Sequence, residues 1–70
     1  MYEIKHVLLG DIHQYHTLHQ QIMDAFGPET RYAQVGGYCV YWHGDTPPGD
    51  KLWIAIGDAL TEKALAENND

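Results

Sequence analysis

Apolar and polar residues alternate along residues 2–9, which predicts a β-strand. Between residues 12 and 26 the apolar positions recur at helical spacing instead. They form one stripe made of Ile12, Tyr15, His19, Ile22, Met23 and Phe26. Asp11 is a favourable N-cap for this helix, and Gly27 followed by Pro28 is a favourable stop. We therefore predict a strand followed by one amphipathic helix over residues 12–26.

The second half of the chain returns to strand-like patterns. Residues 31–35 and 38–43 flank Gly36 and Gly37, a two-residue hairpin signal of type I′ or II′. The alternative is one long strand over residues 31–43, bent at the glycines. Residues 44–50 are rich in Gly, Pro and Asp and predict a loop. Residues 51–56 alternate like a further strand, and Asp58 would cap a short helix over residues 59–67.

These elements predict an α+β fold of order β-α-β-β-β-α, with a small antiparallel sheet and one packed helix. We expect residues 1–67 to form one domain and residues 68–70 a frayed acidic tail. One register satisfies both hairpins if Val35 faces Tyr38 and His43 faces Lys51. The resulting core face lies under helix 12–26 and contains Ala33, Val35, Tyr38, Val40, Trp42, Leu52, Ile54 and Ile56.

The same register places three aromatic residues, Tyr32, Tyr41 and Trp53, on the opposite face of the sheet. A single helix covers only one face, so these rings need another cover. Either the C-terminal helix lies over them, or they contact a second copy or a different protein. Aromatic side chains on a polar surface are typical anchors of protein interfaces. We take this face as the candidate contact surface.

The charge of the chain bears on the class of partner. Ten acidic residues face four basic ones, which gives a formal net charge of −6. Phosphate backbones need clustered Lys and Arg, and the four basic residues are scattered along the sequence, so direct binding of nucleic acid is disfavoured. We expect a protein partner that is basic, or a homodimer, with Asp45 and Asp50 in the rim of the contact.

The sequence also indicates a compartment. Cys39 is the only cysteine, so no internal disulfide is possible, as in most cytosolic proteins. The first residues carry charges where a signal peptide would be apolar, and the longest apolar run is too short to cross a membrane. We expect a cytoplasmic protein with no membrane contact.

Five histidines are the most unusual feature of the composition. His13, His16 and His19 follow at three-residue steps, which walk around a helix instead of converging on a metal. His6 and His19 are both predicted to point inward and to be buried. They are the weaker candidates for a metal site or a proton-sensitive core. We expect no cofactor.

Signatures of catalysis are missing from the sequence. Gly36 and Gly37 are too short a pair for a phosphate-binding loop, and a lone strand cysteine such as Cys39 is usually packing. We therefore predict a non-enzymatic protein-binding or regulatory module, of the kind that acts as an acidic inhibitor of a nucleic-acid-handling protein complex. The alternative is a histidine-based metal-binding or pH-responsive domain.

Overall fold

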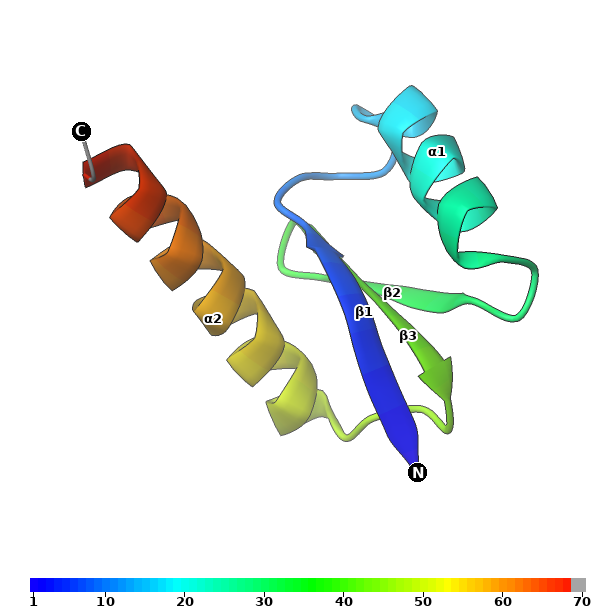
Figure 1. Ribbon diagram of the computed structural model, residues 1–70. Helices are drawn as coiled ribbons and strands as arrows, with labels where there is room; N and C mark the ends of the chain where they lie inside the picture. The colour runs from blue at the N-terminus through cyan, green and yellow to red at the C-terminus, as the bar shows by residue number, and fades with distance from the viewer. Residues whose placement is uncertain (69–70) are drawn as a thin grey trace.

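A computed structural model of the chain describes residues 1–68 and shows an antiparallel sheet of three strands between two helices (Figure 1). Along the chain the elements are β1 (Tyr2–Leu8), α1 (His16–Phe26), β2 (Arg31–Val35), β3 (Tyr38–Gly44) and α2 (Gly49–Asn68). The predicted class, an α+β fold with a small antiparallel sheet, is confirmed. The order is β-α-β-β-α, one strand fewer than we expected.

The hairpin of β2 and β3 has the predicted register. Val35 pairs with Tyr38 across the turn, and the pairing continues along both strands as expected. The turn glycines have φ angles of +56° at Gly36 and +83° at Gly37, and a type I′ turn needs positive φ at both positions. The alternative of one long bent strand is therefore wrong.

The sheet has the order β1-β3-β2, so β3 lies in the centre and β1 forms an open edge. Four consecutive residues of β3, Cys39 to Trp42, are buried, as expected of a strand covered on both faces. A bulge between Ile4 and His6 shifts the pairing of β1 with β3. β1 thus takes the place beside β3 that we had assigned to residues 51–56.

Residues 51–56 are the main correction, because they belong to helix α2 and not to a strand. Leu52, Ile54 and Ile56 alternate as in a strand, but Leu52 and Ile56 are also four residues apart and share one helix face. Both are buried, whereas Ile54 is 52% exposed, as a helix requires. The helix begins at the prolines, where the Pro48 carbonyl accepts the amide N–H groups of Lys51 and Leu52. Asp58, predicted as a cap, lies inside this helix.

Each helix covers one face of the sheet (Figure 1). On the α1 side the buried cluster contains Leu8, Ile22, Cys39 and Tyr41. On the α2 side it contains Val40, Trp42, Leu52 and Ile56. The expectation that helix 12–26 packs on the face of Val40 and Trp42 is therefore wrong. α2 supplies two aliphatic side chains to the face of Val40 and Trp42, and α1 packs on the face that carries the Cys39 thiol and the Tyr41 hydroxyl.

Helix α1 starts four residues later than predicted. The carbonyl of Asp11 accepts the amide N–H groups of Gln14 and Tyr15, and its carboxylate accepts the N–H of His13 at 2.7 Å. Asp11 thus stabilises a turn ahead of the helix and does not cap the helix itself, whose N-cap is Tyr15. The predicted end at Phe26 is confirmed.

Within residues 1–68, no helix is both long and apolar enough to cross a membrane. Of the tail that we expected over residues 68–70, Asn68 still belongs to α2. Residues 69 and 70 lie outside the described part of the chain.

Candidate functional site

The three aromatic residues of the predicted contact face do not share a surface. Tyr41 has no exposed area, so it cannot touch a partner, and its assignment as a contact residue is wrong. Tyr32 lies beside it at the same face and is 44% exposed. Trp53 is on α2, which covers the opposite face of the sheet. The prediction of a shared aromatic face was wrong because it paired Trp53 with Tyr41, and that pairing required residues 51–56 to be a strand.

Tyr41 belongs to a buried polar network under α1. Its hydroxyl lies 2.7 Å from Nδ1 of His19, and the ring of His19 packs edge-on against Tyr32 with 4.8 Å between centroids. Burial raises the pKa of the Tyr41 hydroxyl, and the neighbouring Cys39 thiol raises it further. Burial likewise raises the pKa of Cys39, so this thiol stays protonated and is a poor nucleophile. The network therefore holds α1 against the centre of the sheet.

Trp53 packs against the β2–β3 turn. A Cβ atom added to Gly36 would lie 2.5 Å from Cη2 of the Trp53 ring, so the indole sits directly on that glycine. Trp53 is nevertheless 52% exposed. Trp53 thus anchors the start of α2 to the hairpin.

The predicted acidic rim is exposed, as a rim requires. Asp45 and Asp50 lie in and after the loop that leads from β3 to α2. The carboxylate of Asp45 pairs with the amino group of Met1, and this hydrogen bond lowers the pKa of Asp45. Asp50 lies in the first turn of α2, where a negative charge interacts favourably with the helix dipole.

The two candidate histidines differ in exposure. His19 is buried as predicted, whereas His6 is exposed, so the expectation that both are buried is wrong for His6. The bulge in β1 turns His6 toward α1, where its ring centroid lies 6.3 Å from that of Phe26 and 6.3 Å from that of Tyr41. No group of three His, Cys, Asp or Glu side chains among residues 1–68 is placed to hold a metal ion.

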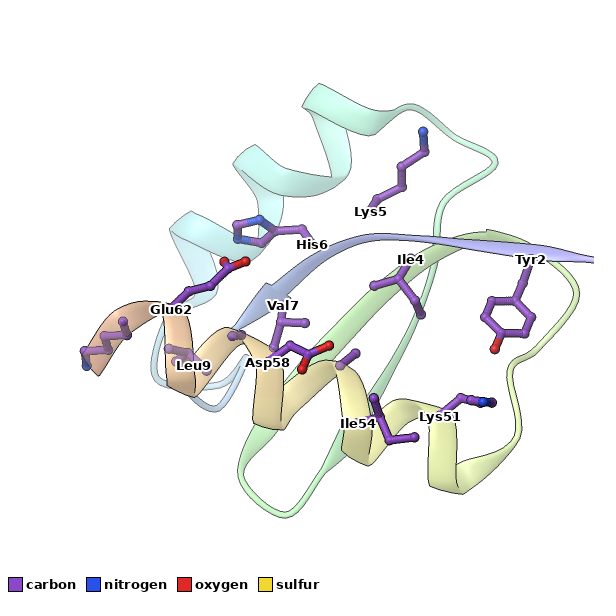
Figure 2. Close-up of a pocket in the computed structure, with 13 residues that line it drawn as sticks. Tyr2, Ile4, Lys5, His6, Val7, Leu9, Lys51, Ile54, Asp58 and Glu62 are labelled. Carbon is purple, nitrogen blue, oxygen red and sulfur yellow. The ribbon is translucent and has the colours of Figure 1, made fainter. Parts of the chain in front are cut away.

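A hollow lies elsewhere, between the open edge strand β1 and helix α2, and we call it the β1–α2 groove (Figure 2). It has a volume of about 720 Å³. Its lining is Tyr2, Ile4, Lys5, His6, Val7, Leu9, Lys51, Ile54, Ala55, Asp58, Ala59, Glu62 and Lys63. Ile4 and Val7 pack on the α2 side of the sheet, whereas His6 faces α1. The groove therefore wraps around the free edge of β1.

Charge is unevenly distributed between the groove and the rest of the chain. Three of the four basic residues, Lys5, Lys51 and Lys63, line the groove together with two carboxylates, those of Asp58 and Glu62. The lining thus has a formal charge of +1, which leaves −7 for the remainder of a chain whose total is −6. Lys5 pairs with Glu3 at 2.8 Å. No ion pair found within residues 1–68 involves Lys51 or Lys63.

Helix α2 extends beyond the body of the protein (Figure 1). Its buried residues, Leu52 and Ile56, lie in its first half, and every residue from Leu60 to Asn68 is exposed. Leu65 on this free half is 64% exposed. α2 therefore offers apolar surface that the described part of the chain does not cover.

The sequence contains one signal for the groove. Its α2 lining recurs at helical spacing, at positions 51, 54, 55, 58, 59, 62 and 63. This stripe becomes visible only once the segment is assigned as helix. No protein-family model, curated protein or solved structure matches the chain at a significant level, so function has to be inferred from its own residues.

Proposed function

We propose that this chain is a non-enzymatic protein-binding module and that the β1–α2 groove is its binding surface. The observation that carries the proposal is the meeting of a free sheet edge with exposed apolar and basic side chains in one hollow. Ile54 is the key apolar residue, because it lines the groove and is 52% exposed. Exposed apolar surface next to an unpaired strand edge is typical of sites that accept a strand of another protein.

The shape of the groove favours a protein segment over a small molecule. It follows the seven residues of β1, which at roughly 3.3 Å per residue is a length of about 23 Å. The backbone N–H and C=O groups on the outer edge of β1 are available for pairing. An extended segment can use these groups along its whole length, whereas a compact ligand would leave most of them unused.

Two variants of α2 test the proposal. Ile54→Glu places a charge in the groove, whereas Leu65→Glu places the same charge on the same helix outside it. Proteins bound to the tagged chain in cells of its source are compared for the wild type and both variants. We expect a partner, either another protein or the untagged chain itself, that the wild type and Leu65→Glu retain and Ile54→Glu loses. Identical partners for all three proteins would contradict the proposal.

A basic partner is the second candidate, supported by the formal charge of −7 outside the groove. Such a surface suits a protein whose basic cleft normally holds DNA or RNA, and the chain would then act as an acidic inhibitor of that complex. Exposed Asp45 and Asp50 would mainly accelerate association. Replacing both by Asn should slow association with a captured basic partner at low salt and have little effect at high salt. Equal rates at low salt would contradict this role, and Asp24→Asn on α1 is the matched control.

A further inference from the structure

One part of the groove, around Ile4 and Ile54, is self-complementary. β1 and α2 run along it in the same direction, and Figure 2 shows the labelled side chains of the two elements following in matching order. Ile4 of β1 and Ile54 of α2 both line the groove, and Lys51 and Asp58 lie on either side of Ile54 along the helix. Ile54 therefore lies near the start of the α2 lining, between Lys51 and Asp58, and Glu62 and Lys63 follow further along the helix.

β1 carries a matching pattern of its own. Glu3 and Lys5 flank Ile4 and pair with each other on the α1 side of the sheet at 2.8 Å. In an antiparallel pairing of two copies of β1 centred on Ile4, Glu3 of each copy faces Lys5 of the other. Opposite charges directly across two strands attract, and like charges repel. The bulge falls on Lys5, the residue between Ile4 and His6 that has no partner on β3, so this self-complementary stretch ends there and covers residues 3–5.

The antiparallel pairing of two β1 strands relates the two copies by a twofold axis, and this axis also relates their α2 helices. Antiparallel strand pairing keeps both α2 helices on one face of the joined sheet, so the two Ile54 side chains meet near the axis. Lys51 lies one turn before Ile54 and Asp58 one turn after it, and an antiparallel arrangement brings Lys51 of one copy toward Asp58 of the other. An isologous interface requires such reciprocal matches.

We propose that a second copy of this chain occupies the β1–α2 groove, pairing β1 with β1 about Ile4 to make one six-stranded antiparallel sheet. The inference rests on the proposed binding function of the groove and names its occupant. Self-association encloses Lys5 and Lys51 and leaves a strongly acidic outer surface. A foreign strand could use the same edge, but it would not require Glu3 and Lys5 to be complementary to each other.

The competing explanation is that Lys5 and the bulge protect the edge of β1 from pairing with other strands. A lysine and a bulge on an edge strand are also devices by which monomeric proteins prevent strand pairing. Under that explanation Lys5 repels other strands, and the chain stays monomeric at every concentration. The charge of residues 3 and 5 therefore decides between the two explanations.

The experiment uses Glu3→Lys and Lys5→Glu, with mass measured by light scattering from micromolar to millimolar concentration. We expect the wild type to dimerise and each variant to dimerise about tenfold more weakly or worse, because both cross-strand pairs become repulsive. An equal mixture of the two variants should form a heterodimer, because each glutamate then faces a lysine. Asp24→Lys and Arg31→Glu make the same charge changes outside the groove and should dimerise like the wild type.

A charge-swapped chain serves as the control for folding defects in the single variants. The double variant Glu3→Lys/Lys5→Glu retains the composition and the cross-strand pairs, so it should dimerise again, and circular dichroism confirms folding of each variant. A wild type that is monomeric throughout overturns the inference, as does a dimer that neither variant weakens. Either result leaves the proposed function standing if Ile54→Glu still loses a foreign partner.

Discussion

The Tyr41 hydroxyl lies 2.7 Å from Nδ1 of His19, and this hydrogen bond joins the centre of the sheet to α1 inside the core. Both side chains are buried, so the loss of one partner leaves the other without a hydrogen bond. We expect Tyr41→Phe to lower the free energy of unfolding by about 1–3 kcal/mol, measured by urea denaturation. Tyr32→Phe, on a ring that is 44% exposed, should change it by less than about 0.5 kcal/mol. Equal losses in the two variants would contradict the role of the bond.

The stability of the fold should decline in alkali. Burial raises the pKa of Tyr41, whereas in the unfolded chain a tyrosine ionises near about pH 10. Above that pH the unfolded state has released a proton that the folded state retains, so the free energy of unfolding falls as pH rises. Cys39, whose pKa burial also raises, contributes with the same sign from a slightly lower pH. Denaturation curves from about pH 8 to 11 should show this fall, and Tyr41→Phe should make it shallower. An identical slope in the variant would argue against it.

The two glycines of the hairpin turn should respond differently to alanine. Both have positive φ, but a Cβ at Gly36 would also meet the Trp53 ring, whereas one at Gly37 has nothing within 4 Å. We expect Gly37→Ala to cost about 1 kcal/mol of unfolding free energy and Gly36→Ala at least about 1 kcal/mol more. In a Trp53→Ala background the two costs should become equal. If the difference persists there, Trp53 does not pack on the turn.

Gly57 offers a test of the helix that replaced the predicted strand. It lies in the interior of α2, is exposed, and has space for a Cβ. Gly57→Ala should therefore raise the free energy of unfolding by about 0.5–1 kcal/mol, because alanine is the better helix former. The reverse change at an exposed site of the same helix, Ala64→Gly, should lower it. A loss of stability in Gly57→Ala would contradict the helical assignment.

Local signals in the sequence were sufficient for three elements. The strand at residues 2–9, the hairpin around Gly36 and Gly37, and the end of α1 at Gly27 all depend on residues close to one another in the chain. Turn glycines and helix stops act through backbone conformation, which tertiary packing seldom overrides. These parts of the fold were predicted with small errors at their ends.

The prediction of a strand over residues 51–56 was wrong because the apolar residues of this segment fit both the two-residue period of a strand and the period of a helix. Leu52 and Ile56 fit both a strand face and a helix face, and only the exposure of Ile54 separates the two. Residues 59–67, which follow this segment, are mostly good helix formers. They favour one continuous helix that begins just after Pro48 and includes residues 51–56. The consequence was large, because the misassigned strand led us to place Trp53 beside Tyr41, to expect Tyr41 on an open contact face, and to put α1 on the wrong face of the sheet.

The groove could not be predicted while β1 had no assigned place in the sheet. Its lysines are at positions 5, 51 and 63 of the sequence, and they line one groove only because β1 is an edge strand beside α2. Scattered basic residues therefore indicated no site. Spatial clustering of this kind depends on sheet order, which no local pattern specifies.

The most direct test of the central proposal is to locate the contact itself. A photo-reactive benzoylphenylalanine is placed at Ile54 in the groove or, as a control, at exposed Gln20 on α1, and the chain is irradiated in cells of its source. Our account predicts a covalent adduct to a protein, either a second copy or another chain, from position 54 and none of that mass from position 20. An adduct from position 20 alone, or from neither position, would contradict the proposal that this chain works by binding protein in the β1–α2 groove.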